Sequence, residues 1–202
     1  MTCRITQDAL RQYVRFAEQG RVVVFDTETT GTSNADEIIQ LAAAEYVCGN
    51  LERTLDLYLI PSCPIRPQAE AVHHITLPFL LEHGINPPEA LERFFDFLGG
   101  NVLLVGHNIH FDFRMLQNSC RKYDVGFQPN EVSFCDTIAF SKKMVPGLDH
   151  YRLGCLVEAL GLSGVNSHNA LDDTLACAEL FFDLVRRVPI CAEDYIYEPI
   201  FE

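Results

Sequence analysis

Asp26 and Glu28 stand two residues apart, directly after Val22 to Phe25, four apolar residues with high β-propensity. Such a run is typical of a strand that is buried on both faces. Side chains at i and i+2 of an extended chain point to the same face, so both carboxylates can project to one side. Hard oxygen ligands of this kind suit Mg²⁺ or Mn²⁺. The same spacing also fits two solvated acids at the end of a strand.

Two further acids follow buried elements later in the chain. Asp112 falls in the first turns of a helix expected from about residue 109, where the helix dipole favours a carboxylate. Asp173 lies in the first turns of the last long helix, five residues after His168. Apolar residues three, four and seven positions later place Asp173 on the inward side of that helix, whereas Asp172 can be solvated. Burial of an Asp costs several kcal/mol unless it is paired or binds a metal.

The four carboxylates are predicted to converge on one edge of the sheet. Two divalent ions about 3.5–4 Å apart, held by such a set, promote in-line displacement at phosphorus. One ion would activate water, and the other would stabilise the departing 3′ oxygen. His168 suits the role of general base, because an unperturbed imidazole pKa of about 6.5 lets it take a proton near neutral pH. A lone histidine is more often structural, and this one is singled out by its place five residues before an inward acid.

These motifs resemble those of the DEDDh group of 3′→5′ exonucleases, the DnaQ-like superfamily that includes the epsilon proofreading subunit of bacterial DNA polymerase III. The three matching segments are Asp26-Thr-Glu-Thr-Thr-Gly31, Gly106-His-Asn-Ile-His-Phe-Asp112 and His168-Asn-Ala-Leu-Asp-Asp173. Histidine at 168 marks the "h" branch of the group. Weaker similarity at Val72-His-His-Ile-Thr76, where His74 replaces the usual glycine, and at Cys135-Asp-Thr-Ile-Ala extends the likeness over about residues 20 to 187.

The resemblance implies a role for each matched position. It implies four metal ligands, namely Asp26, Glu28, Asp112 and Asp173, and His168 as the general base. Positions that contact the terminal nucleotide in the family are matched by Thr29, His73 and Phe111, whereas His107 and Asn108 are expected to support the turn. The implied cofactors are two divalent cations, Mg²⁺ or Mn²⁺. The implied substrate is the 3′ end of single-stranded DNA, with RNA as an alternative. The protein partners that the resemblance leaves open are a DNA polymerase and a CRISPR integrase.

The implied fold is an α/β, ribonuclease H-like domain, with a five-stranded mixed sheet that has one antiparallel strand and is flanked by helices. The residues themselves predict an antiparallel hairpin at 37–60 with a tight Gly49-Asn50 turn. Pro61, Pro64 and Pro67 are expected to interrupt regular structure. Other strands are expected at 21–26, 102–105 and 131–135, and helices at 7–18, 109–123, 136–144, 153–160 and 170–186. The predicted divisions are an N-terminal helix at 1–19, an exonuclease domain at 20–187 and an acidic, aromatic C-terminal tail at 188–202.

The composition limits the function further. A net charge of −13 argues against a general phosphate-binding surface. The stretch 114–152 carries six Lys or Arg against four acids, and is either a solvated helix face or a phosphate-tracking surface. Eight cysteines without a Cys-x-x-Cys pair indicate reduced, buried thiols rather than disulfides or a zinc site. The sequence shows neither a signal peptide nor an apolar run of about 20 residues, so the cytoplasm is the expected compartment.

Three functions fit these observations. The leading hypothesis is a metal-dependent 3′→5′ exonuclease that releases nucleoside monophosphates from single-stranded DNA, in proofreading, repair or end trimming. The alternative within the same chemistry is a 3′→5′ exoribonuclease or a short-oligonucleotide nuclease, since sugar choice depends on contacts around the 2′-OH. The alternative from another class is a non-catalytic nucleic-acid-binding scaffold, which would have no need to keep four inward acids.

Overall fold

Five strands form one mixed sheet in a computed structural model that describes residues 5–126 and 132–189. Their order is β3-β2-β1-β4-β5. β2 runs antiparallel to both of its neighbours, whereas β4 is parallel to β1 and β5 is parallel to β4. The prediction of a mixed sheet with one antiparallel strand is therefore confirmed. The strands are β1 (Arg21–Thr29), β2 (Ile38–Val47), β3 (Asn50–Tyr58), β4 (Val102–Gly106) and β5 (Val132–Asp136).

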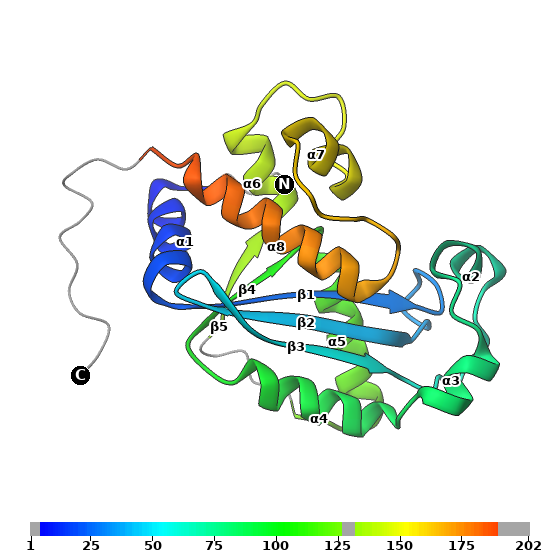
Figure 1. Cartoon of the computed structure of the whole chain (residues 1–202). Helices are drawn as coiled ribbons and strands as arrows, with labels where there is room; N and C mark the ends of the chain where they lie inside the picture. Colours follow the sequence, from blue (N-terminus) through cyan, green and yellow to red (C-terminus); the bar gives the residue numbers. More distant parts are fainter. Residues whose placement is uncertain (1–4, 127–131, 190–202) are drawn as a thin grey trace.

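Helices cover both faces of this sheet (Figure 1). The core on one face is built with α1, α6, α7 and α8, and the core on the other face with α4 and α5. The short helices α2 and α3 lie beyond the end of the sheet to which β1 points. The helices are α1 (Gln7–Gln19), α2 (Pro67–His73), α3 (Leu77–His83), α4 (Pro87–Leu98), α5 (Ile109–Tyr123), α6 (Thr137–Met144), α7 (Leu153–Leu160) and α8 (Ala170–Arg186).

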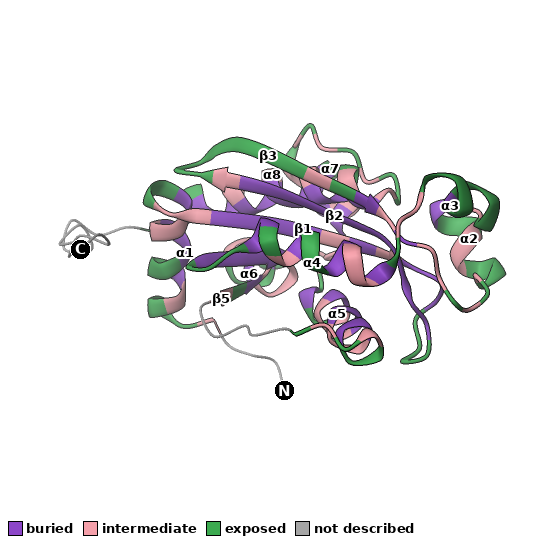
Figure 2. Cartoon of the chain, turned by 90° about the horizontal axis from the view of Figure 1, so that it is seen from below, coloured by how far each residue is buried: buried purple, intermediate pink, exposed green. Residues whose placement is uncertain are grey.

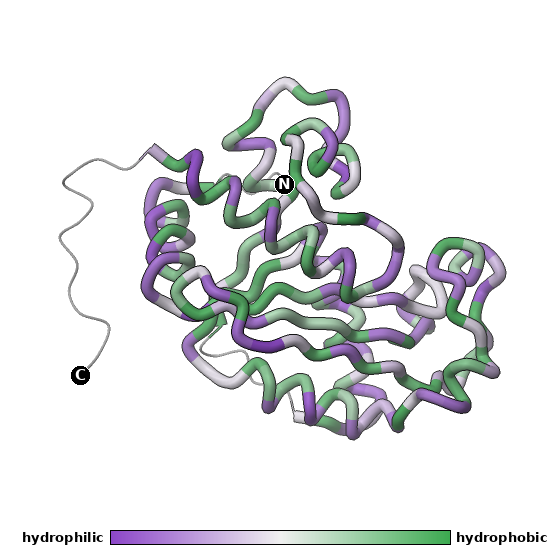
Figure 3. The backbone as a smooth tube through the Cα atoms, in the orientation of Figure 1, coloured by the Kyte–Doolittle hydropathy of each residue, from purple (hydrophilic) through white to green (hydrophobic). Residues whose placement is uncertain are grey.

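Strand β1 is the central strand, and its side chains alternate between the two cores. Val22 and Val24 pack in the core under α8, whereas Val23 and Phe25 pack in the core under α4 and α5. This two-residue period follows from the pleat of the strand. Burial is complete along the middle of the sheet, which Figure 2 shows as a buried layer between more exposed helices. The surface helices alternate in hydropathy along their length, as amphipathic helices do (Figure 3).

The hairpin between β2 and β3 is present, but its turn lies one residue earlier than predicted. Val47 pairs with Asn50, so the two turn residues are Cys48 and Gly49. Both have positive φ, 48° and 79°. Two-residue hairpin turns of this kind need positive φ at both central positions, because their twist then matches that of the strands. The prediction of Gly49-Asn50 as the turn was therefore wrong. Cys48 occupies the first turn position with a positive φ, a conformation that side chains disfavour and that its residue type does not predict.

The proline-rich segment also differs from the prediction. Pro61 and Pro64 lie in irregular chain, but Pro67 begins helix α2. Proline is tolerated at the first helical position, because the N–H that it lacks would have no partner within the helix. Residue 131 of the predicted last strand and residues 190–202 of the predicted tail lie outside the described residues. The division into 1–19, 20–187 and 188–202 stays a prediction.

The cysteines that the structure describes are all unpaired. Cys135 and Cys177 are buried among apolar side chains and Cys155 is half-buried. Burial raises the pKa of the Cys177 thiol, so it remains protonated near neutral pH. Within the described ranges, no helix combines the length and the apolar character that crossing a membrane requires.

The loop that follows β1 is fastened to α5 and to the chain before α2. Glu37 accepts hydrogen bonds from Lys122 Nζ at 2.6 Å and from the Tyr123 hydroxyl at 2.8 Å. Arg114 donates to the carbonyl of Thr32 at 3.3 Å. Two of the six basic residues in the stretch 114–152 thus hold the loop. Part of the positive charge of that stretch therefore stabilises the fold. Neither interpretation of the stretch, as a solvated helix face or as a phosphate-tracking surface, predicted this role.

We expect Glu37 to contribute stability that depends on pH. Burial alone would raise the pKa of Glu37, but hydrogen bonds from Lys122, Ser62 and Tyr123 outweigh it and lower the pKa to about 2. A carboxyl with a depressed folded-state pKa stabilises the protein above its unfolded value of about 4.5, and this stability is lost as pH falls toward about 2. Glu37→Gln is expected to lower the melting midpoint at neutral pH by about 4–10 °C, from hydrogen bonds to a charged group worth about 1.5–3 kcal/mol.

The measurement is thermal unfolding of wild type and Glu37→Gln near pH 7 and near pH 2.5. The difference between the two midpoints should shrink at the lower pH, because the unfolded chain takes up a proton on Glu37 below about pH 4.5 and most of the stability from the depressed pKa is then already lost. The control is Glu52→Gln, which removes an exposed carboxylate on β3 and should change the midpoint little at either pH. An equal difference at both pH values would contradict the assignment.

Candidate active site

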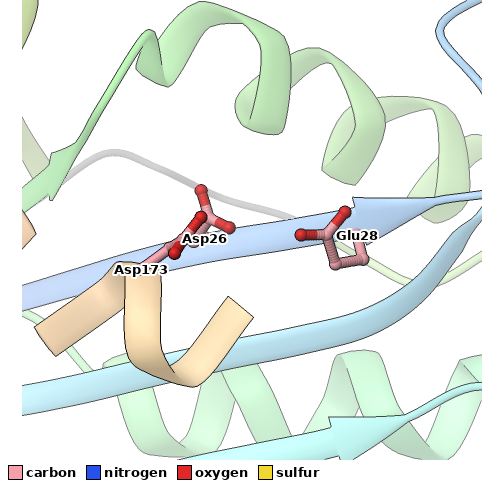
Figure 4. A group of neighbouring side chains, drawn as sticks. All are labelled: Asp26, Glu28 and Asp173. Atoms are coloured by element: carbon pink, nitrogen blue, oxygen red, sulfur yellow. The ribbon is translucent and has the colours of Figure 1, made fainter. Parts of the chain in front are cut away.

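The first two acids of the candidate site lie on β1 and face α8. Asp26 and Glu28 continue the alternation of Val22 and Val24, whose side chains pack under α8. Figure 4 shows both carboxylates on β1, with Asp173 reaching them from α8. One carboxylate oxygen from each of the three lies within 4.8 Å of the others. The i, i+2 spacing in the sequence thus does place two acids on one face, where a third acid meets them.

Asp173 is held in place by the segment that precedes α8. It lies in the first turn of the helix and is 7% exposed. Its two carboxylate oxygens accept from Asn166 Nδ2 at 2.7 Å and from the Ser167 backbone N–H at 3.0 Å. Asp172 is exposed, as the helical periodicity predicts, and accepts from the Ser167 hydroxyl at 2.6 Å. Asp173 therefore points inward with oriented oxygens.

Asp112 approaches the same group of acids from α5. It is 3% exposed, and its Oδ1 accepts from the Thr27 hydroxyl at 2.6 Å and from the Thr27 backbone N–H at 3.1 Å. It is not one of the three carboxylates that lie within 4.8 Å of one another. It is nevertheless close enough for its charge to raise the pKa of both Asp26 and Glu28. The fourth acid thus stands beside the other three.

The crowding of these acids shifts their protonation. Burial, and then the charges of Asp173 and Asp112, raise the pKa of Glu28 to about 8. Burial and the neighbouring carboxylates also raise the pKa of Asp26. Burial raises the pKa of Asp173, although Asn166 and the backbone N–H of Ser167 oppose it. Carboxylates this close disfavour one another's ionised form. A cation bound among them would favour the ionised form again. The donor set is all carboxylate oxygen and fits a hard divalent cation.

His168 lies on the chain just before α8, and its side chain is exposed. Its φ is 56°, a left-handed conformation that is uncommon for a residue with a side chain. His168 lies close enough to Asp173 to lower the pKa of that carboxyl. The imidazole therefore stands beside the carboxylate group. An exposed imidazole beside the acids can exchange protons with solvent, as a general base must.

Two of the three predicted nucleotide contacts are next to an acid in the sequence, and the third lies beside one of these two. The Thr29 hydroxyl donates to the Gly31 carbonyl at 2.7 Å, at the end of β1. His73 is buried, and burial lowers its pKa, although the Thr29 backbone partly opposes this and so places the ring beside Thr29. Phe111 precedes Asp112 on α5, and its ring centroid lies 5.3 Å from the guanidinium of Arg114. Their contacts with a nucleotide stay predictions.

Sequence reasoning missed several residues that support the acids. Thr27 carries no pattern that predicts its bonds to Asp112, and nothing near Asn166 predicts its bond to Asp173. Gln40 is a polar residue within an apolar strand, and this signal could have drawn attention to it. His107 was expected to support the turn, and its Nδ1 lies 2.9 Å from the Thr137 hydroxyl. Asn108 adopts a left-handed conformation in the same turn.

The sequence and the fold have counterparts in known proteins. Residues 23–181 match the model of the exonuclease family RNase_T. The structure resembles that of exonuclease I, with a TM-score of 0.71 at 23% sequence identity, over 83% of this chain and 43% of that one. That similarity concerns the fold. The chain belongs to the exonuclease family, within its DnaQ-like 3′→5′ group.

Three relatives with similar sequences are all longer than this chain. The chain is 35% identical to a DNA polymerase III subunit epsilon-like protein of Rhodobacter capsulatus, over 81% of this chain and 23% of that protein. It is 32% identical to the 3′-5′ exonuclease DinG of Bacillus subtilis, over 83% and 18%. It is 29% identical to a PolC-type DNA polymerase III of Caldanaerobacter subterraneus, over 84% and 12%. The chain therefore spans less than a quarter of each of these relatives.

Proposed function

We propose that this protein is a metal-dependent 3′→5′ exonuclease that releases nucleoside monophosphates from the 3′ ends of single-stranded DNA. The observation that carries the proposal is the set of three carboxylates, on Asp26, Glu28 and Asp173, within 4.8 Å of one another. Asp112 beside them completes four acids, drawn from three separate elements. A binding module would gain nothing from concentrating negative charge where phosphate must approach.

We propose that the four acids hold two divalent cations, Mg²⁺ or Mn²⁺. When bound, such cations lower the pKa of water and stabilise the charge on the attacking and departing oxygens. His168 takes the proton of the attacking water, since its side chain is exposed beside the acids. The bonds from Asn166 and Ser167 orient Asp173, and those from Thr27 orient Asp112. Thr29, His73 and Phe111 would contact the terminal nucleotide.

The relatives favour DNA as the substrate. Solved structures of E. coli exonuclease I contain single-stranded DNA, and one of these is a zinc-bound form. Matches to DNA polymerase III proteins favour a replication or repair partner. They give no support to an integrase partner. A 3′→5′ exoribonuclease or short-oligonucleotide nuclease remains the alternative within the same chemistry, and a non-catalytic scaffold remains the alternative outside it.

The test compares DNA and RNA strands of one sequence, each labelled at the 5′ end. The protein with Mg²⁺ should shorten the DNA stepwise from its 3′ end and release nucleoside 5′-monophosphates, because hydrolysis frees the 3′ oxygen. A 3′-phosphorylated DNA strand is the matched control, and its degradation should be slower. Faster digestion of RNA would favour the exoribonuclease. Binding without turnover of either strand would favour the scaffold.

A further inference from the structure

The amide side chain of Gln40 joins three elements beneath the candidate site. It lies on β2, is 0% exposed, and stands within a strand that is otherwise apolar around it. Its Nε2 donates to Asp56 Oδ1 at 2.9 Å and to the Tyr58 hydroxyl at 3.2 Å, both on β3. Its Oε1 accepts from the backbone N–H of Ala170 at 3.1 Å. A buried amide with partners on two other elements connects the sheet to α8.

The partners fix the orientation of this amide. A backbone N–H can only donate, so the atom that faces Ala170 must be the oxygen. An ionised carboxylate can only accept, so the atom that faces Asp56 must be the nitrogen. No single apolar or purely acidic side chain meets both demands. This argues that position 40 needs an amide for its geometry, and that the contact with Ala170 is specific.

The contact with Ala170 satisfies the first N–H group of α8. The next two N–H groups, of Leu171 and Asp172, are capped by the Asn169 side chain at 3.1 and 3.4 Å. The N–H of Asp173 donates to the Asn169 carbonyl at 2.9 Å. These caps lie within the segment of the helix itself, so they do not tie its start to the sheet, although the Asn169 side chain also hydrogen-bonds Tyr58 on β3. Gln40 ties the first N–H group of the helix directly to β2.

Gln40 is also the cross-strand partner of Glu28. The two residues face each other in the antiparallel pairing of β1 and β2. Directly opposed side chains lie on the same face, with Cβ atoms about 4.5–5.5 Å apart. Gln40 therefore fixes the start of α8 at the strand position where Glu28 stands. This junction therefore sets how far Asp173, in the first turn of α8, and His168, just before it, lie from Glu28.

We propose that Gln40 is a positioning residue for the carboxylate site. It holds the start of α8 so that Asp173 meets Asp26 and Glu28, and it acts through these residues without touching the substrate. The inference rests on the proposed function of that site as a metal-dependent nuclease. Since Gln40 is fully buried, its loss should lower turnover and metal binding but leave substrate affinity unchanged.

The test uses Gln40→Met, which keeps the length of the side chain and removes its hydrogen bonds. We expect kcat on single-stranded DNA to fall about 10- to 100-fold, as is typical for residues that orient metal ligands, with KM within about two-fold of wild type. The rise in melting midpoint caused by Mn²⁺ should shrink in parallel. Gln40→Glu keeps an acceptor for Ala170 but sets a second carboxyl against Asp56, so it should recover kcat only in part. If Gln40→Met does not fold, Gln40→Asn, whose amide is too short to reach Ala170, takes its place.

Ile39→Val is the matched control. Ile39 is also 0% exposed on β2, but it faces the other side of the sheet and packs against Ile75 and Leu80. It should lower stability without changing kcat or the Mn²⁺ effect. Wild-type kcat and Mn²⁺ response in Gln40→Met would overturn the inference, as would equal losses in Ile39→Val. If wild type hydrolyses nothing, the proposed function fails. In that case, a smaller Mn²⁺ response in Gln40→Met would still support the role of Gln40, and an unchanged response would overturn it.

Discussion

Asp26→Asn is expected to lose more than about 100-fold in the rate of nucleotide release, because even residues that only support metal ligands are worth about 10- to 100-fold. Asp26 lies among the three carboxylates within 4.8 Å of one another. Asparagine keeps the shape of the side chain but supplies a weaker, neutral ligand. The substitution also removes one charge from a crowded acidic group, so the metal-free variant should be at least as stable as wild type. Loss of activity would then have no explanation in unfolding.

The matched control for this prediction is Asp172→Asn. Asp172 has the same chemistry and lies in the first turn of α8, next to Asp173, but its side chain is exposed. Its variant should keep activity within about two-fold of wild type. Asp173→Asn should behave like Asp26→Asn, although it also disturbs the bonds from Asn166 and Ser167. Equal activity in the Asp26 and Asp172 variants would rule out the assigned ligands.

Local periodicity explains why the directions of the acids could be predicted from the sequence. The pleat of β1 sets Asp26 and Glu28 on one face, and the turn of α8 sets Asp173 inward and Asp172 outward. Each of these inferences needs only the few residues around it. The mixed sheet with one antiparallel strand followed from the family resemblance and from the hairpin, since alternation of strands and helices alone fits several sheets.

Contacts between distant parts of the chain could not be predicted in this way. Thr27 and Asp112 are 85 residues apart, and Gln40 and Ala170 are 130 residues apart. Periodicity shows which way a side chain points on its own element, but not which element it will meet. The same limit applies to Lys122, which belongs to the stretch predicted to be either a solvated helix face or a phosphate-tracking surface and in fact binds Glu37. Charge counts along the sequence do not show which charges are already paired.

Removal and return of the divalent cation should give the second large effect. A chelator should abolish nucleotide release, and Mg²⁺ or Mn²⁺ should restore it, because the grouped carboxylates supply all the oxygen ligands proposed for the site. The same cation should stabilise the fold. Mn²⁺ at about 100 times its Kd adds about 2.7 kcal/mol, which corresponds to a midpoint about 5–10 °C higher for a chain of this size.

The pH dependence of this stabilisation follows from the acids themselves. Without metal, the pKa of Glu28 is raised to about 8. A carboxyl with a raised folded-state pKa stabilises the metal-free fold below its unfolded value of about 4.5, and this stability is lost as pH rises toward about 8. Protons and metal compete for the same oxygens, so the midpoint shift caused by Mn²⁺ should grow between about pH 6 and pH 8.5. Asp26→Asn should show a much smaller shift throughout, and Asp172→Asn the same shift as wild type. A shift independent of pH, or equal in Asp26→Asn and wild type, would mean that the cation binds elsewhere.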